Sequence, residues 1–259
     1  MLAEPRTPRL AILIDAENTS ARIAPGLFQE IAKIGEASVR RIYGDFSRTN
    51  LKPWTDILAA HAIMPHQNFA YTTGKNASDI ALVIDAMDLL HSGRLDGFCL
   101  VSSDSDFTRL AARIREQGLD VYGFGEQKTP ESFVRACRRF VYTENLLPIA
   151  HCSERSAALP KLALKPLSAA AKVLRMAIMQ LDDKDGWVHL AQVGARLLTL
   201  ASDFDPRSYG RSKLIDLVEA TGSFEVQRKD AGEVQIRVKP ATAVPVARNA
   251  QPPLKAVSK

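Results

Sequence analysis

The chain has 259 residues, of which 46% are hydrophobic and 24% charged, which is enough for two ordinary domains. No apolar run approaches the roughly 18 to 20 residues of a bilayer span, and the first eight residues lack a secretory signal's apolar core, so we expect a cytoplasmic protein without a membrane partner. Three cysteines without a CxxC pair and five histidines without HxxxH or HExxH argue against a disulfide framework and a zinc motif. Residues 1–150 hold 17 Lys and Arg against 18 Asp and Glu, whereas residues 151–259 hold 17 against 11, so the basic surplus favours a polyanionic partner for the second part.

The first part of the chain, up to about residue 147, alternates short apolar, β-branched runs with longer segments of helical period. This pattern predicts an α/β domain with a parallel sheet sandwiched by helices. The expected strands are residues 10–15, 38–43, 62–69, 97–102 and 120–124. The expected helices are residues 24–34, 52–60, 78–91, 107–117 and 130–137.

A seam follows this first domain, for which we expect the bounds 1–149. Residues 150–167 break the periodicity and carry two prolines, which predicts a linker. The second domain is expected at 168–240, with helices at 168–181, 190–200 and 209–219 and two strands at 224–228 and 233–239. Three helices closed by a hairpin predict a small winged helix, and the Ala, Pro and Lys-rich residues 241–259 predict a disordered tail.

Acidic residues follow the first and fourth expected strands directly. Asp15 ends the first strand, Asp104 and Asp106 come just after the fourth, and Asp79 lies in the first turn of a helix. Carboxyl ends of parallel strands line one crevice, so these acids can converge there. Crowded carboxylates repel one another unless a cation lies among them, and oxygen ligands select Mg²⁺ or Mn²⁺. Such an ion can activate water and offset charge on a phosphodiester.

Each acid also has a purely structural interpretation. A single Asp at a strand end commonly caps free amides, and Ser103 or Asp104 could cap the helix that begins near Phe107. For Ser102 and Ser103 we favour capping over a phosphate contact. Capping alone does not account for three element ends that supply acids to one face, so the set favours a metal site. A phosphatase with an aspartate nucleophile is disfavoured because the first motif lacks the Asp-x-Asp that such enzymes place there.

Four ordered motifs of the first domain resemble the NYN domain, in its LabA-like, PIN-related branch. They are IDAEN at 14–18, YGDF at 43–46, GKNASDIALVIDAM at 74–87 and SSDSDF at 102–107, and the match continues through RFVYTEN at 139–145. The resemblance implies a PIN-like fold and endoribonuclease chemistry with Mg²⁺ or Mn²⁺. By motif position, it assigns the acidic set to Asp15, Asp79, Asp104 and Asp106, with Asn18 as a positioning residue.

Two further residues belong to the third motif. Asp85 lies six residues after Asp79, which turns it some 120° away around a helix, so we expect it to be a structural or supporting partner. Lys75, in the loop before the helix, could contact a phosphate as a point charge, although an exposed lysine is more often simply solvated.

The second domain resembles the OST-HTH, or LOTUS, domain. The resemblance rests on DGWVHLAQVG at 185–194, FDPRSYGRSKLIDLVE at 204–219 and FEVQR at 224–228, and it implies an RNA-binding module. A helix-turn-helix presents its last helix and wing to phosphates, which predicts contacts without sequence preference from Arg207, Arg211, Lys213, Arg228 and Lys229. Tyr209 could stack on a base or pack in the core, and we expect Trp187 to be core.

The leading hypothesis is a metal-dependent ribonuclease whose second domain holds single-stranded or structured RNA. The choice of RNA over DNA depends on the resemblance, so DNA stays open as a substrate. The alternative is a non-catalytic RNA-binding or regulatory adaptor, since fold resemblance alone does not establish activity. The second domain could instead bind a protein or a second copy of the chain.

Overall fold

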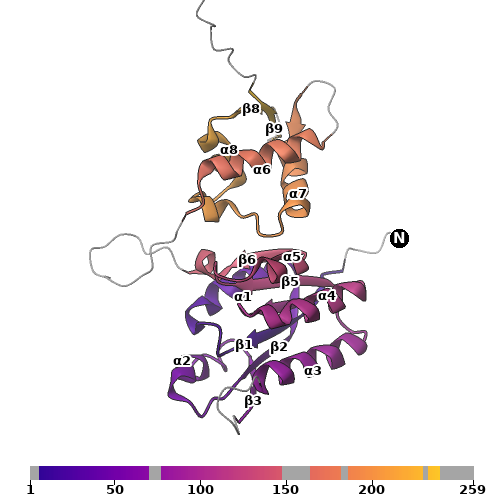
Figure 1. The fold of residues 1–259 in the computed structure, drawn as a ribbon, viewed down its shortest axis with the longest axis vertical. Coiled ribbons are helices and arrows are strands. Elements are labelled where there is room, and N and C mark those ends of the chain that lie inside the picture. Colours follow the sequence, from indigo (N-terminus) through magenta and orange to yellow (C-terminus); the bar gives the residue numbers. More distant parts are fainter. Residues whose placement is uncertain (1–5, 70–76, 148–163, 182–185, 230–232, 240–259) are drawn as a thin grey trace, which may run out of the picture.

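The computed structural model describes residues 6–69, 77–147, 164–181, 186–229 and 233–239 (Figure 1). Lys75, most of the expected linker (residues 150–163), and the expected tail (241–259) lie outside the described residues. None of the described helices is long and apolar enough to cross a membrane.

The first domain is built on a six-stranded sheet in which every pair of neighbours is parallel. Its order is β3-β2-β1-β4-β5-β6. The strands are β1 (Arg9–Asp15), β2 (Glu36–Gly44), β3 (Met64–Gln67), β4 (Gly97–Val101), β5 (Asp120–Gly125) and β6 (Arg139–Tyr142). The predicted α/β sheet is confirmed, and the sequence analysis missed only β6 among these strands.

Helices cover both faces of this sheet (Figure 1). They are α1 (Ala24–Ala32), α2 (Lys52–Thr55), α3 (Ala77–His91), α4 (Thr108–Glu116) and α5 (Glu131–Ala136). Short 3-10 turns stand at Ala21–Ile23, Thr49–Leu51, Ser105–Phe107 and Thr143–Leu146. The expected helix at 52–60 is shorter than predicted, since α2 ends at Thr55 and turns follow it.

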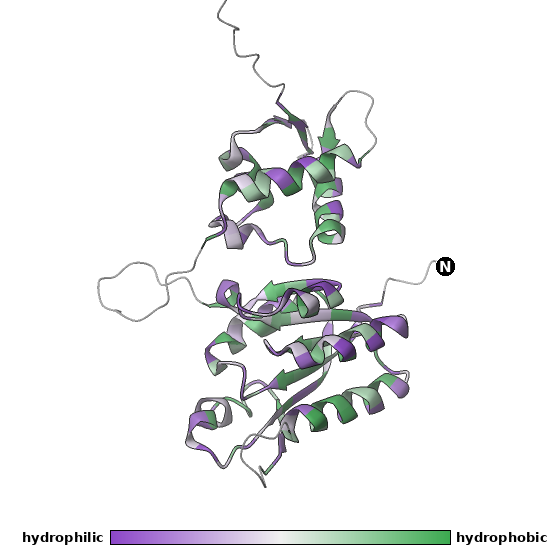
Figure 2. Ribbon diagram, viewed as in Figure 1, coloured by the Kyte–Doolittle hydropathy of each residue, from purple (hydrophilic) through white to green (hydrophobic). Residues whose placement is uncertain are grey.

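Strand β1 is apolar along almost its whole length because both of its faces are covered. Ala11 and Leu13 pack into one core with α3, α4 and α5, whereas Ile12 and Ile14 pack into the other with α1. All four residues are fully buried. A strand covered on both faces has no solvent side and therefore becomes a continuous apolar run. In Figure 2, α3 is largely hydrophobic whereas hydrophilic residues recur along α4.

The second domain contains three helices and a small antiparallel sheet of order β7-β9-β8. Its elements are α6 (Leu167–Met179), β7 (Val188–His189), α7 (Leu190–Leu200), a 3-10 turn η5 (Pro206–Tyr209), α8 (Leu214–Thr221), β8 (Phe224–Arg228) and β9 (Val234–Val238). The expected helix at 209–219 begins later, because Gly210 adopts the left-handed conformation with φ 74° and ends η5.

The two domains touch at strand β6, which is the edge of the large sheet, and at helix α5, which precedes it. The Phe140 amide donates to the Ser202 carbonyl oxygen at 2.8 Å. The Ser202 hydroxyl donates to the Val134 carbonyl oxygen at 2.9 Å, and the Tyr142 hydroxyl donates to Asp203 at 2.8 Å. The loop after α7 therefore covers an edge that would otherwise offer free backbone groups to other chains.

Candidate active site

Asp15 is the most firmly held acid at the carboxyl edge of the sheet. It is 1% exposed, and its carboxylate accepts four hydrogen bonds. The donors are the Glu17 amide (3.1 Å), the Asn18 amide (3.2 Å), the Asn18 side-chain amide (2.8 Å) and the Ser102 hydroxyl (2.7 Å). A carboxylate has about four lone-pair positions, so these donors fill Asp15 and fix its orientation.

Ser102 connects Asp15 to the loop that follows β4. Its hydroxyl donates to Asp15 and accepts from the Asp104 amide at 3.1 Å. Ser103 accepts from the Glu126 amide at 2.8 Å, in the loop after β5. Neither serine caps the following helix, so the capping role that we favoured for them is wrong. That role belongs to Asp104, which accepts from the Asp106 amide at 2.9 Å and caps the turn Ser105–Phe107.

Asp79 carries a raised pKa, to which burial and the other acids contribute. It lies in the first turn of α3 and is partly buried. Burial raises the pKa of Asp79 to about 6, and the negative charges of Asp15, Asp104, Glu17 and Asp106 add to this effect. The charges of the four other acids therefore act on Asp79, although the contribution of burial is larger.

Glu17 is the member of this group that the sequence analysis missed. Its charge contributes to the raised pKa of Asp79, and its side chain is exposed. The signal was present in the first motif, where Glu17 stands two residues after Asp15.

Asp85 takes no part in this acidic group. It forms an ion pair with Arg41 and accepts a hydrogen bond from the Tyr43 hydroxyl, both on β2. Burial opposes its ionisation, but the bonds from Tyr43 and Arg41 outweigh burial and lower the pKa of Asp85. The residue therefore holds α3 against β2.

The carboxylates at this edge suit a hard divalent cation. Their ligating atoms are all oxygen, and positive charge relieves the repulsion between them. Within the described ranges, no three Asp, Glu, His or Cys side chains are already grouped closely enough to hold an ion. To bind the cation, the Asp15 carboxylate would have to give up one of its present hydrogen bonds, such as the bond from the Ser102 hydroxyl.

A hollow of about 370 Å³ adjoins the acidic edge on the side of β1. Polar and charged side chains line it, with buried Trp54 beside them. The residues that carry its character are Glu17, Asn18, Arg22, Asn50 and Lys128. Asn18 thus both holds Asp15 and faces a space that a ligand can enter.

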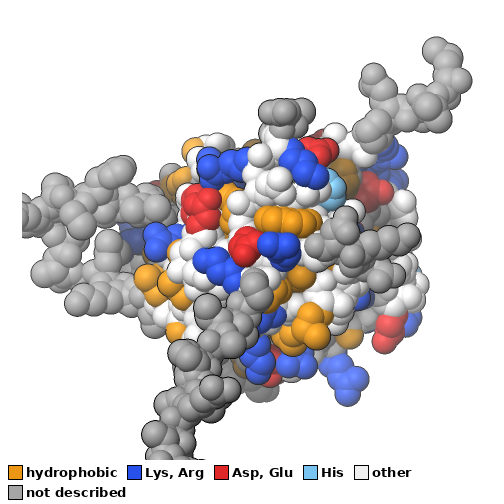
Figure 3. All heavy atoms as spheres, turned by 90° about the horizontal axis from the view of Figure 1, so that it is seen from above, with side chains coloured by type: hydrophobic (Ala, Val, Ile, Leu, Met, Phe, Trp, Pro, Cys, Tyr) orange, Lys and Arg blue, Asp and Glu red, His pale blue; other side chains and the backbone are white. Residues whose placement is uncertain are grey.

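The expected nucleic-acid residues of the second domain divide into two groups. Arg211, Lys213, Arg228 and Lys229 are exposed, although Arg228 is paired with Glu219 at 2.9 Å. Figure 3 shows Lys and Arg side chains interspersed with Asp and Glu on the face that carries this domain. This interspersion is weaker support for a phosphate surface than a uniformly basic patch would be.

Arg207 and Tyr209 lie elsewhere than we expected. Arg207 pairs with Asp205 at 2.6 Å and reaches Glu30 of the first domain at 3.2 Å. Tyr209 is 8% exposed and packs against Phe204 in the core of the second domain. Their bonding and burial within the protein are the reason that we do not retain them as nucleic-acid contacts.

Trp187 also differs from expectation. It is partly exposed rather than fully in the core, and the Arg237 guanidinium lies over its ring at 4.7 Å from the centroid. Arg237 is in turn paired with Glu225 on the neighbouring strand. The indole is therefore part of a surface stack at the wing.

Three solved structures are distant likenesses of this chain. A protein of unknown function from Vibrio parahaemolyticus is 20% identical, with 55% of this chain and 96% of that chain covered and a TM-score of 0.45. An uncharacterized protein from Nitrosomonas europaea is 30% identical, with 35% and 90% covered and a TM-score of 0.27. MurG from Acinetobacter baumannii is 15% identical, with 75% and 63% covered and a TM-score of 0.36. No curated protein matches the chain.

The family comparison is specific for both domains. The NYN domain model matches residues 9–147, which contain the whole parallel sheet and every acid of the edge described above. The OST-HTH/LOTUS domain model matches residues 165–236, which contain the three helices and most of the small sheet. The chain therefore belongs to the NYN domain family, and an OST-HTH/LOTUS domain follows its NYN domain.

Proposed function

We propose that this protein is a metal-dependent ribonuclease that hydrolyses RNA phosphodiester bonds, with Mg²⁺ or Mn²⁺ held by Asp15, Asp79, Asp104 and Asp106. The NYN domain belongs to the PIN-like nuclease superfamily, which supports nuclease chemistry. The observation that carries the proposal is that Asp15 and Asp104 stand at the carboxyl ends of β1 and β4, and that the charges of these and other acids add to burial in raising the pKa of Asp79.

The side chains at the carboxyl edge of the sheet have different roles in the proposed reaction. Asp15, held by Asn18 and Ser102, supplies a fixed negative charge. When bound, the ion supplies Lewis acidity toward a phosphate oxygen and a more acidic water. Asp79, with a pKa of about 6, is mostly ionised at neutral pH and holds a proton in mild acid. Protons should therefore compete with the cation for Asp79 below about pH 6, so that cleavage needs more Mn²⁺ in mild acid than at pH 7.

Cleavage of labelled single-stranded and structured RNA, measured with Mn²⁺, Mg²⁺ or EDTA, tests the proposal. Asp104→Asn is the informative variant, and Asp88→Asn is its control because Asp88 is an exposed acid on α3. We expect cleavage only with a metal, retained in Asp88→Asn and reduced at least about 100-fold in Asp104→Asn. Cleavage that persists in EDTA or in Asp104→Asn would refute the metal site.

A second candidate function is a non-catalytic RNA-binding adaptor. The filled carboxylate of Asp15 favours it, together with the lack of a ready three-acid group among the described residues. RNA binding without cleavage under any metal condition would establish this candidate in place of the nuclease.

The second domain is proposed to hold the RNA strand through the exposed residues Arg211, Lys213, Arg228 and Lys229. Its membership of the OST-HTH/LOTUS family supports this role. Arg211→Gln with Lys213→Gln should weaken RNA binding and reduce its salt dependence. Lys172→Gln with Arg175→Gln, two exposed cations of α6, is the control pair. Equal effects of the two pairs would contradict the assignment.

A further inference from the structure

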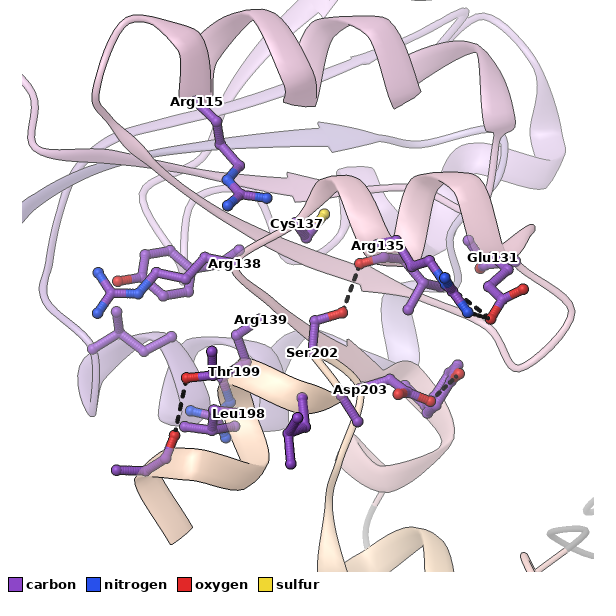
Figure 4. Close-up of a pocket in the computed structure, with 18 residues that line it drawn as sticks. Arg115, Glu131, Arg135, Cys137, Arg138, Arg139, Leu198, Thr199, Ser202 and Asp203 are labelled. Carbon is purple, nitrogen blue, oxygen red and sulfur yellow. Dashed lines mark hydrogen bonds and ion pairs between the residues drawn. The ribbon is translucent and has the colours of Figure 1, made fainter. Parts of the chain in front are cut away.

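A groove of about 870 Å³ runs between the two domains, away from the acidic edge (Figure 4). Residues from α4, β5, α5 and β6 line one wall, and the end of α7 with the loop after it lines the other. The bonds that join the domains also fix these walls, since Ser202 and Asp203 belong to the groove and bind Val134 and Tyr142.

The groove is rich in guanidinium groups. Four arginines line it, against two acids, and Figure 4 shows that they come from different elements of the first domain. The arginines are Arg115, Arg135, Arg138 and Arg139, and the acids are Glu131 and Asp203. The lining residues thus carry more positive than negative charge, while Arg138 and Arg139 are paired with two acids outside the lining, Asp120 and Glu30.

Three of these arginines can exchange their present partners for a ligand. Arg135 pairs with Glu131 and Arg138 with Asp120, but the two side chains are 76% and 61% exposed. Exposed pairs of this kind contribute only about 0 to 1 kcal/mol, so an anion can displace them at little cost. Arg115 donates to the Ala136 carbonyl oxygen at 3.2 Å and is also exposed.

The groove and the acidic edge share one loop. Thr129, in the loop after β5, lines the groove, whereas Glu126 and Lys128 of the same loop line the smaller hollow beside Asn18. Ser103, next to Asp104, also binds this loop through the Glu126 amide. The loop after β5 therefore lies between the end of the groove at Thr129 and the hollow that Asn18 lines.

We propose that the groove binds the phosphate backbone of single-stranded RNA and leads the strand across the loop after β5 to the acidic site. Guanidiniums spread over several elements suit successive phosphates better than one compact anion. A single nucleotide would also need a ring to stack on, but the tyrosines of the groove, Tyr122 and Tyr142, are half-buried and buried, and both hydroxyls are bonded within the protein. The inference rests on the proposed function.

The test is a binding measurement that does not depend on cleavage. Full-length protein carrying Asp104→Asn is kept in EDTA, and the affinity for a labelled single strand is measured over a range of salt. Arg115→Gln with Arg138→Gln should weaken binding severalfold and lower the slope of log K against log salt by about 1.4, from about 0.7 for each lost phosphate contact. Arg135→Gln alone should lower the slope by about 0.7. Because Arg135 is exposed, this single variant still tests the groove if the double variant does not fold.

Arg94→Gln with Arg113→Gln is the matched control. Both arginines are exposed on the first domain and lie outside the groove lining, and replacing them removes the same charge as the groove double variant does. An unchanged slope in this control supports the groove. Equal losses in the two double variants would overturn it, because net charge would then explain both. If the wild type cuts RNA but the groove variants bind it as tightly as the control does, the proposed role of the groove is wrong and the proposed nuclease activity stands. Groove-dependent binding without cleavage by the wild type would support the groove while refuting the nuclease.

Discussion

Glu30 of the NYN domain accepts a hydrogen bond from Arg207 of the OST-HTH/LOTUS domain at 3.2 Å, and its other carboxylate oxygen accepts from Arg139 at 2.9 Å. The Glu30 side chain is only 4% exposed. Burial opposes its ionisation, but the Lys33 bond and the charges of Arg207 and Arg139 outweigh burial and hold the pKa of Glu30 below its usual value. One carboxylate therefore joins α1, β6 and the second domain.

Removing this charge should loosen the domain interface. Glu30→Gln leaves Arg139 and Arg207 without their shared anion, and loss of one partner from a largely buried network costs about 3 kcal/mol. Urea unfolding measures the loss, and small-angle scattering should show a less compact molecule. Glu116→Gln is the control, because its pair with Arg113 is exposed and should contribute under about 1 kcal/mol. An unchanged scattering profile in Glu30→Gln would show that the other bonds between the domains, such as those of Ser202 and Asp203, hold them together without the Glu30 charge.

The same carboxylate makes the interface sensitive to acid. Folding favours the ionised form of Glu30, because its pKa is lowered from the ordinary 4.5. Its contribution is therefore fully present above about pH 4.5 and is lost as the pH falls through the lowered pKa. The stability difference between the wild type and Glu30→Gln should narrow steadily from pH 5 toward pH 3. A constant difference over this range would mean that the Glu30 charge contributes nothing.

Asp79 should behave in the opposite sense. Its pKa rises from 3.8 to about 6 on folding, so the folded protein holds the proton more tightly and loses stability as the pH rises from about 4 to 6. Allowing for solvent screening of this partly exposed group, Asp79→Asn should stabilise the metal-free protein by ~1–2 kcal/mol at pH 7 and by little at pH 4. Thermal unfolding in EDTA at the two pH values measures this.

Asp88→Asn provides the comparison for that experiment, since Asp88 is an exposed acid of the same helix and should change stability little at either pH. If Asp79→Asn destabilises the metal-free protein at pH 7, burial and the neighbouring acids do not disfavour the ionised form of Asp79. A gain in stability together with a loss of cleavage would show that the charge of Asp79 costs the metal-free fold stability and is needed for the reaction.

The sequence predicted most of the parallel sheet, because buried strands such as β1 and β4 are apolar along their whole length. It missed β6, whose four residues are an edge that becomes a strand by pairing with β5. It also missed β7, which has two residues and depends on pairing with β9. Short strands are set by their neighbours in space, and single-sequence periodicity does not contain that information.

The acidic site was more predictable than the surface of the second domain. Strand ends locate Asp15 and Asp104 from sequence order alone, since carboxyl ends of parallel strands meet at one edge. Arg207 looked like a phosphate contact because of its place in a helix-turn-helix pattern. Its partner Glu30 lies 177 residues away in sequence, so only the packing of the two domains shows that it is engaged.

Asp85 provides a last test, because it lies in the same motif as Asp79 but is expected to stabilise the fold and not to take part in the reaction. Asp85→Asn removes the ion pair with Arg41 and weakens the bond from Tyr43, so it should destabilise the protein by about 2 to 3 kcal/mol. Both side chains of the ion pair are less than a third exposed, at 28% for Arg41 and 19% for Asp85. Urea unfolding of Asp85→Asn, Arg41→Gln and the double variant measures the coupling, which should exceed about 1 kcal/mol.

A supporting role also predicts what Asp85→Asn leaves unchanged. Where the variant is folded, it should bind Mn²⁺ and cut RNA as the wild type does, because its charge is directed at β2 and not at the acidic edge. Asp79→Asn, six residues earlier in the same helix, should lose both properties. If Asp85→Asn loses Mn²⁺ binding while keeping its stability, Asp85 is a metal ligand. The assignment of Asp79 to the metal site and of Asp85 to the contact between α3 and β2 would then be wrong.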